Sequence, residues 1–472
     1  MRIVRAAGIV ISLALVAVFG GGHLLRAAAL AYPGPNGPGA FHLILLLLAA
    51  PVVVVSGIVL LLAPGVLPLA GTPQPSQGEV LLKGALVALV VDAAGFGLVK
   101  LVLGPEPSPA AFRGMAALLP VLGWVALLLQ CRRAGPAGPE ALRFLPGLAL
   151  RVALVAGLAV LLLFPVLFWQ DLNPDGLELF TAGRSLAQFL LPHLPTGRLP
   201  GLGLGMLTSA GLVHWFQVLF GTLDATARLP VVAALPLLYG ATLTLIESGA
   251  ARRAGLTERG LLLLALCALV ATLVCNGTYH PYSADPASPS GVDVLLLAFL
   301  TMQVYFLWTE QPMWFLLATA LAYLTRPTGL LLPLILGVAI VLAGGERRWA
   351  RLRLVALGVL LCLLIQIGYE RIYGALAGAS FFEPSAEIGG RRLRYLSFGQ
   401  WSRMLYVLLP SGVLPALSLL WWRHQDRLSR ILTLSTVGYF GFFYFPSFTA
   451  LHHFAPVMLL PLAVFWRLML AR

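Results

Sequence analysis

The stretch whose residue types could do chemistry is WQDLNPDGLELFTAGRSL, residues 169–186. It directly follows an apolar segment and carries three acids, Asp171, Asp175 and Glu178, in a chain with only 10% charged residues. A carboxylate at a membrane boundary costs free energy unless it is solvated or takes part in binding or catalysis. An acidic cluster there therefore indicates a functional site. On a helix, positions 175 and 178 share one face. A carboxylate within hydrogen-bond reach of a hydroxyl group can act as a general base.

The same stretch also fits a purely structural interpretation. The sequence Asn-Pro-Asp-Gly at 173–176 is strong turn chemistry, and Asp175 could be the N-cap of a helix that begins at Leu177. The sequence leaves both interpretations open for the three acids.

The elements that must position these acids are apolar helices. Of the 472 residues, 59% are hydrophobic, and the mean hydropathy is +0.92. Apolar runs long enough to span a bilayer, about 17–25 residues each, recur from end to end and predict an all-α polytopic membrane protein. The net charge of +13 comes mainly from arginines in short loops, so we expect no nucleic-acid partner. The four cysteines show no metal-binding spacing.

The apolar runs predict about fourteen membrane crossings. The expected spans are 7–30, 41–66, 81–103, 115–130, 146–169, 229–247, 260–276, 292–308, 312–324, 328–342, 352–368, 404–422, 431–445 and 454–466. The first run follows Arg2 and Arg5 without a clear cleavage site, which predicts a retained helix rather than a signal peptide. Several spans in the middle of the chain are short, so we expect them to pack inside the bundle or to tilt with their neighbours.

Arginine placement predicts the orientation of these spans. With both termini in the cytoplasm, most arginine clusters fall on the cytoplasmic side, and the group around Arg391 is the exception. The segment 205–220 must then not cross, and its glycines with His214 and Gln217 indicate an interfacial or re-entrant helix. The outer face receives the loops 170–204, 277–291, 369–403 and 447–453, and we expect the active site there.

From residue 146 onward, the order of features resembles the GT-C class of membrane glycosyltransferases, which includes protein mannosyltransferases and the aminoarabinose transferases of lipid A. The matching pieces are NPDGLELFTAGRSL, ESGAARRAG, SPSGVDVLLLAFLTMQVYFLW and LAYLTRPTGLLL. They correspond to an outer acidic loop, a helix ending in basic residues, an outer loop ending in an acid at a helix start, and a Lys/Arg-Pro-x-Gly-like turn. The family often has Asp-Glu in the first piece, where this chain has Asp175-Gly176, with Glu178 as a possible replacement.

The resemblance implies transfer of a sugar from a polyprenyl-phosphate donor at the outer face of a bacterial inner membrane. Asp175 would be the general base, with Glu178 and Asp293 as further catalytic acids. The planar guanidinium of arginine binds phosphate oxygens in a bidentate way. The candidate phosphate-binding residues are therefore cationic: Arg184, Arg326, Arg391, Arg392, Arg394, His452 and His453. A divalent metal, Mg²⁺ or Mn²⁺, could be held by Asp175 with His280 or Asp285, although their spacing has no metal signature.

Structural roles are open for these residues as well. Asp293 could only cap its helix, and Arg326 could extend to the membrane interface. The three arginines at 391–394 could contact anionic lipid headgroups, and His452 with His453 could be interfacial residues.

The chain divides in this interpretation into three parts. Residues 1–145 are an N-terminal extension of four helices with no counterpart in the GT-C plan, and they could bind a protein partner. Residues 146–370 are the catalytic membrane module, and 371–472 add an outer loop and three helices. Two other functions fit the same pattern: a non-catalytic GT-C-like subunit of a membrane complex, and a transporter or flippase of a lipid-linked saccharide. A transporter predicts ionisable residues deep within several helices, whereas most acids of this chain fall at span ends.

Overall fold

The computed structural model describes part of the chain, mainly its second half. The described residues are 79, 82–91, 94–95, 114, 118, 121–122, 125, 153, 157, 180–181, 183, 207–221, 226, 229–247, 291–377, 416, 418–444 and 455–470. This part is overwhelmingly helical and contains no strand, so the prediction of an all-α protein is confirmed for the described residues.

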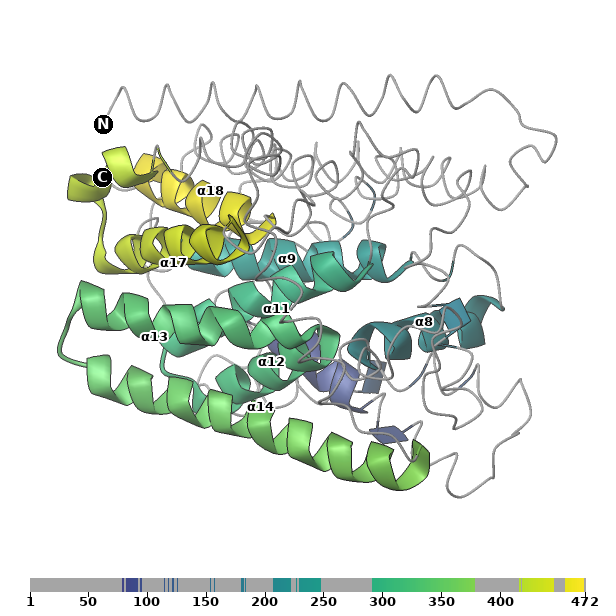
Figure 1. Ribbon diagram of the computed structural model, residues 1–472. Helices are drawn as coiled ribbons and strands as arrows, with labels where there is room; N and C mark the ends of the chain where they lie inside the picture. The colour runs from purple at the N-terminus through teal and green to yellow at the C-terminus, as the bar shows by residue number, and fades with distance from the viewer. Residues whose placement is uncertain are drawn as a thin grey trace, which may run out of the picture.

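Helix α11, Gly291–Trp308, lies at the centre of the described bundle. Every residue from Leu295 to Leu307 is buried. A helix that is apolar on all sides must be surrounded by other helices. Its main neighbours are α9, Leu229–Glu247, and α12, Pro312–Thr325. Figure 1 shows α11 between these two helices.

The remaining helices pack around this centre. A 3₁₀ turn, η6 (Pro327–Leu330), leads from α12 into α13, Leu331–Ala343, which packs against α14, Arg348–Ala377. Helix α17, Arg427–Tyr444, packs against α13 and against α18, Ala455–Leu470, which also contacts α9. A 3₁₀ turn, η7 (Trp422–His424), precedes α17, and α8, Leu207–Phe220, contacts α9, α11 and α12.

The expected spans agree closely with several of these helices. The run 229–247 has the bounds of α9, and the runs 292–308 and 312–324 differ from α11 and α12 by one residue. The run 328–342 begins in η6 and continues as α13, while 431–445 and 454–466 lie on α17 and α18. Long apolar runs therefore locate the helices well.

The expected bounds 352–368 are wrong for α14, which is a single helix of 30 residues. Arg348, Arg351 and Arg353 lie inside the helix rather than in a loop, and residues 369–377, expected in a loop, are helical. Hydropathy marks where a helix is apolar, not where it ends, and the flanking Arg, Ala and Leu residues are good helix formers. The expected boundary between 370 and 371 falls inside this helix.

One stretch of α14 stands out by length and hydropathy. Among the described residues, only Arg348–Tyr369 is long and apolar enough to cross a membrane. Its mean hydropathy is 2.1, and only 22% of it is buried in the protein. The shorter apolar helices are Leu82–Val91, Leu295–Trp308, Pro312–Thr325 and Thr328–Ala343.

Candidate functional site

Two of the predicted site residues fall within the described part of the chain. Asp293 is the third residue of α11, so it lies in the first turn of this helix. Arg326 is the residue between α12 and η6. The other predicted residues lie outside the described residues: Asp175, Glu178, Arg184, His280, Asp285, Arg391, Arg392, Arg394, His452 and His453.

The sequence Arg326-Pro-Thr-Gly329 forms a tight turn at the end of α12. Arg326 is extended, with φ −161° and ψ 136°, as expected for a residue before proline. Its N–H donates to the carbonyl of Ala322 at 2.9 Å, and its own carbonyl accepts from the N–H of Gly329 at 2.8 Å. A Cβ at Gly329 would lie 2.5 Å from the backbone carbonyl of Ala322. The turn therefore requires glycine and holds the half-buried Arg326 on a rigid backbone.

A buried glutamine from the central helix lies against this turn. Gln303 of α11 is fully buried, and its Nε2 donates to the carbonyl of Gly329 at 3.5 Å. Its Oε1 has no hydrogen-bond partner among the described residues. A buried polar group costs free energy unless it is hydrogen-bonded, so Gln303 marks a polar spot in an otherwise apolar bundle, next to the turn that carries Arg326.

Helix α8 connects the Arg326 turn with the segment that follows the acidic stretch. The hydroxyl of Thr208 donates to the carbonyl of Leu321, in the last turns of α12, at 3.4 Å. Toward the other end of α8, Nε2 of Gln217 donates to the carbonyl of Phe180 at 3.1 Å. A Cβ at Gly183 would lie 2.8 Å from Cγ1 of Val213, so the segment packs closely on α8. Phe180 and Gly183 come shortly after Asp175 and Glu178 in the sequence.

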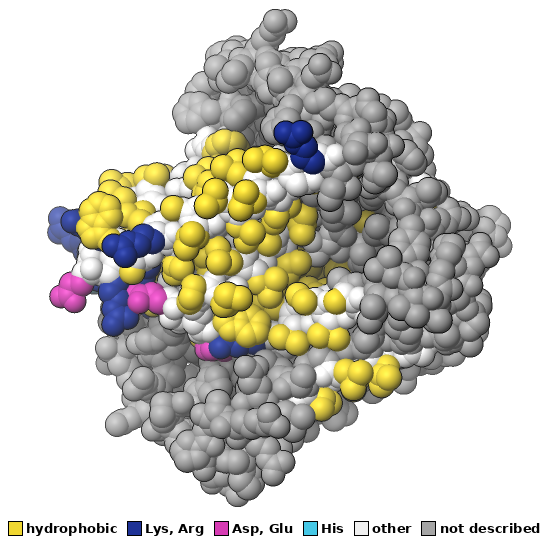
Figure 2. All heavy atoms as spheres, turned by 90° about the horizontal axis from the view of Figure 1, so that it is seen from below, with side chains coloured by type: hydrophobic (Ala, Val, Ile, Leu, Met, Phe, Trp, Pro, Cys, Tyr) yellow, Lys and Arg dark blue, Asp and Glu magenta, His cyan; other side chains and the backbone are white. Residues whose placement is uncertain are grey.

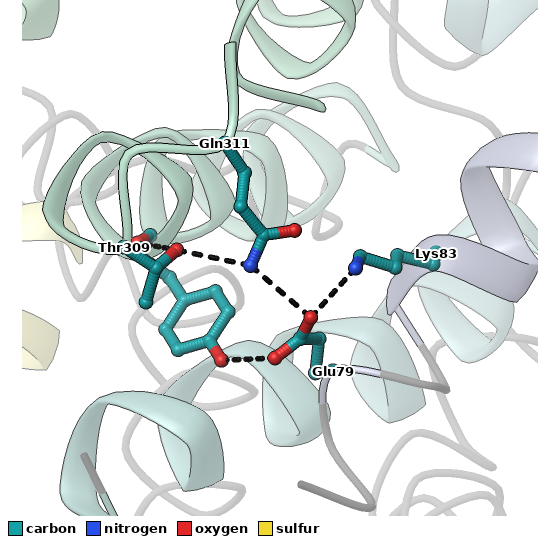
Figure 3. A network of polar contacts seen from close by, with 5 residues as sticks. Glu79, Lys83, Thr309 and Gln311 are labelled. Atoms are coloured by element: carbon teal, nitrogen blue, oxygen red, sulfur yellow. Dashed lines mark hydrogen bonds and ion pairs between the residues drawn. The ribbon is translucent and has the colours of Figure 1, made fainter. Parts of the chain in front are cut away.

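A second polar network, which the sequence did not predict, surrounds Glu79 (Figure 3). Its carboxylate accepts from Nζ of Lys83 at 2.6 Å, from the hydroxyl of Tyr305 at 2.5 Å and from Nε2 of Gln311 at 3.1 Å. The ammonium of Lys83 also lies 5.4 Å from the centre of the Trp314 ring. Burial raises the pKa of Glu79, but the hydrogen bonds and the charge of Lys83 outweigh it and hold the pKa below its ordinary value.

The network predicts that Glu79 stabilises the protein as an anion. We expect Glu79→Gln to lower the free energy of unfolding by about 1.5–3 kcal/mol at pH 7, because a hydrogen bond to a charged group is worth that much. A carboxyl whose pKa is lowered on folding contributes stability above its unfolded pKa and loses it as the pH falls through the folded pKa. The wild type should therefore lose stability below about pH 4.5 more steeply than the variant.

Thermal unfolding in detergent at pH 3.5 to 7 checks this prediction. Glu346→Gln is the matched control, since Glu346 is an exposed acid in the turn between α13 and α14. Equal pH profiles for Glu79→Gln and the wild type would contradict a stabilising role for the anion.

A third network joins two interhelical turns. Glu310, in the turn between α11 and α12, accepts from Nη1 of Arg347 at 2.9 Å and lies 3.2 Å from Nη2 of Arg351. The Arg351 guanidinium lies 4.2 Å from the centre of the Trp308 ring and donates to the Trp308 carbonyl at 3.3 Å. The turn after α11 is thus tied to the start of α14.

A fourth network is built on Arg467, in the last turn of α18 and only 3% exposed. Its Nε donates to the Ser429 hydroxyl at 3.1 Å, and Nη1 donates to the carbonyl of Leu245 at 2.5 Å. Nη2 forms an ion pair with Asp426. One guanidinium therefore holds together the end of α9, the start of α17 and the end of α18.

The last three networks lie at one end of the bundle, which we call the basic end. It comprises the turns 309–311 and 344–347, the segment 421–427, and the ends of α9 and α18. The guanidinium of Arg427 packs against Gly345, which links the Glu310 and Arg467 networks. The Arg326 turn is separated from the basic end by the whole length of α12 on one side and of α13 on the other.

Within the residues that the structure describes, no three His, Cys, Asp or Glu side chains are placed to hold a metal ion. The predicted metal ligands Asp175, His280 and Asp285 are not among these residues. No family model, curated protein or solved structure matches this chain.

Proposed function

We propose that this chain is a polytopic membrane protein and, within the membrane, a glycosyltransferase of the GT-C type. The support for membrane residence is α14. Between the exposed Arg353 and Arg371, the structure describes the exposure of residues 354–369, and the exposed ones among them are all apolar: Ala356, Leu357, Leu360, Leu363, Leu364, Ile367 and Gly368. The stretch between these arginines is about 27 Å long at 1.5 Å per residue, close to the roughly 30 Å hydrocarbon core of a bilayer.

A polar side chain on this stretch, that of Gln366, avoids the exposed face. Gln366 is buried, and its Oε1 accepts from the hydroxyl of Tyr323 on α12 at 2.6 Å. A polar group facing hydrocarbon would cost free energy, whereas leucine there costs nothing. The distribution of side chains on α14 therefore matches contact with lipid. The full set of about fourteen crossings is part of the proposal.

The observation that supports the transferase proposal is that α8 contacts two segments that adjoin predicted site residues in the sequence. Gln217 binds the segment just after Asp175 and Glu178, and Thr208 binds α12 just before Arg326. One helix thus supports a segment next to the proposed base and a helix end next to a proposed phosphate ligand. A GT-C-type reaction needs these two groups on either side of the bond that breaks.

In the proposed reaction, the acceptor hydroxyl oxygen bonds to the anomeric carbon of the sugar. The hydroxyl proton passes to the carboxylate of Asp175, and Glu178 would share its face if this segment is helical. The bond between the anomeric carbon and the phosphate oxygen breaks, and its electron pair leaves with the polyprenyl phosphate. Arg326, with the arginines at 391–394 and the histidines at 452–453, would neutralise that phosphate. Asp293, in the first turn of α11, would be the third catalytic acid beside Asp175 and Glu178.

The test is Asp175→Asn in the native cell. The deletion strain should lose a cell-envelope glycan and accumulate the polyprenyl-phosphate sugar, and the wild-type chain should restore the glycan. We expect Asp175→Asn to lower the rate of restoration by about a hundredfold or more, because general-base catalysis contributes roughly 10²–10⁴-fold. Glycan analysis by mass spectrometry, with protein amounts matched by immunoblot, gives the measurement.

Asp171→Asn is the matched control, since it removes an acid from the same loop and should restore the glycan normally. Arg326→Lys should lower restoration less than Arg326→Gln, because lysine keeps the charge but loses the fork. If Asp175→Asn and Glu178→Gln both restore the glycan fully, the chain is not the transferase. A non-catalytic subunit would then explain the deletion phenotype.

A further inference from the structure

The basic end carries more positive than negative charge around the start of α14. Arg347 and Arg351 both lie close to the carboxylate of Glu310, and the Arg427 guanidinium packs against Gly345 in the same turn, which also carries the exposed acid Glu346. The positive charges of Arg347 and Arg427 both act on Arg351. Among the described residues, the exposed Arg348 and Arg353 have no acidic partner. Like charges at close range repel, so this cluster is unfavourable unless an anion neutralises it.

The position of the arginines makes the cluster still less favourable. Arg348 and Arg351 occupy the first turn of α14, which contains no acid. The N-terminus of a helix carries about half a positive charge, so it favours anions and disfavours cations. The helix dipole therefore disfavours arginine in the first turn of α14. A bound anion would satisfy both the dipole and the arginines.

An exposed apolar surface begins where the arginines end. Leu342 at the end of α13 is 69% exposed, and Trp349 in the first turn of α14 is 63% exposed. From there the exposed leucines of α14 continue toward Arg371. Figure 2 shows this face, seen from the side of α14, as largely hydrophobic, with most of its charged side chains gathered along one edge. A tryptophan between an apolar surface and a basic one is typical of a membrane interface.

We propose that the turn between α13 and α14 binds the headgroup of an anionic phospholipid, whose acyl chains lie along the exposed face of α13 and α14. The phosphate would accept from the guanidinium groups of Arg347, Arg348 and Arg427. The partner is a lipid, because cationic and apolar surfaces adjoin and only an amphipathic anion is complementary to both. This proposal requires residence in a membrane but not sugar transfer, and its site lies at the opposite end of α12 and α13 from Arg326.

The test is lipid binding to the purified full chain, measured by native mass spectrometry in detergent. Phosphatidylglycerol and phosphatidylcholine are the two probes. The wild type should retain phosphatidylglycerol in preference to phosphatidylcholine. The triple variant Arg347→Gln, Arg348→Gln, Arg427→Gln should lose roughly a hundredfold in apparent affinity for phosphatidylglycerol, at about fivefold per arginine. Phosphatidylcholine binding should stay unchanged.

Arg371→Gln is the matched control, because Arg371 is an exposed arginine at the other end of the same helix. Arg348→Gln alone should cost roughly fivefold, and Arg348→Lys should restore most of it, which separates lost charge from misfolding. Equal affinity of the wild type for the two lipids would overturn the proposal. An equal loss of affinity in Arg371→Gln would also overturn it. So would a dimer that contains no phosphatidylglycerol by mass and in which the Leu360→Cys variant cross-links the two α14 helices.

Discussion

Arg467→Met is expected to lower the free energy of unfolding by about 3 kcal/mol, because it removes a buried guanidinium that donates to three groups, one of them the exposed carboxylate of Asp426, and a hydrogen bond to a charged group is worth about 1.5–3 kcal/mol. Methionine can fill the space of the arginine stem, so the loss measures polar contacts rather than a cavity. The carbonyl of Leu245, the hydroxyl of Ser429 and the carboxylate of Asp426 would all lose a donor. Denaturation in mixed micelles, followed by circular dichroism, gives the free energy.

The effect should depend on pH in a defined direction. Burial raises the pKa of Asp426, but the charge of Arg467 and hydrogen bonds from Ser429 and Arg467 lower it below its ordinary value of 3.8. Such a carboxyl contributes stability above about pH 3.8, and this contribution is lost as the pH falls through the folded pKa. The difference in stability between the wild type and Arg467→Met should therefore be full at pH 7 and shrink at pH 3.

Two variants sharpen this prediction. Arg467→Lys should recover part of the loss, since lysine keeps the charge but cannot reach three partners as a fork does. Arg423→Met changes an exposed arginine at the same end of the bundle and should cost less than about 0.5 kcal/mol. An equal loss from Arg423→Met and Arg467→Met would mean that general charge, rather than this junction, stabilises the fold.

The helices were predictable because each apolar run is long and bounded by polar or turn-forming residues. The bounds of α9 agree with the sequence prediction, and those of α11 and α12 differ by one residue. The sequence failed at α14, where the helix extends beyond its apolar core at both ends. The turn at Arg326 was also predictable, since proline and glycine at those spacings allow few backbone paths.

The polar networks were not predictable, because they join residues far apart in the sequence. Tyr305 and Glu79 are 226 positions apart, and Arg467 and Leu245 are 222 apart. Hydropathy says that two helices exist but not which of their ends meet. Gln217 illustrates the same limit: the sequence marked it as a polar residue in an unusual segment, yet only the fold shows its bond to Phe180. For Asp175 and most of its expected partners, the sequence prediction stays a prediction.

The arrangement of charges nevertheless agrees with one feature of the arginine argument. The turns expected on one side of the membrane, at 309–311, 344–347 and 423–427, contact one another through Glu310, Arg347 and Arg427. Which side of a membrane the basic end faces stays a prediction from the positive-inside rule.

Gly329→Ala is expected to destabilise the protein by about 3 kcal/mol, at the upper end of the cost of inserting a methyl group into a packed core. The added Cβ would lie 2.5 Å from the carbonyl carbon and oxygen of Ala322 and 2.9 Å from the nitrogen of Tyr323. These are backbone atoms of α12, so no side-chain rotation can relieve the contact. The turn must open, and its hydrogen bond from Gln303 would weaken.

Gly337→Ala is the matched control, since it adds the same methyl group to α13, where the nearest atom is Cγ1 of Val355 at 3.5 Å. Alanine is a better helix former than glycine, so this variant should be neutral or more stable by up to about 1 kcal/mol. Opposite signs for the two substitutions in one denaturation experiment would support the tight turn. If Gly329→Ala behaved like Gly337→Ala, the turn would not be rigid and would not hold Arg326 in a fixed position for a phosphate.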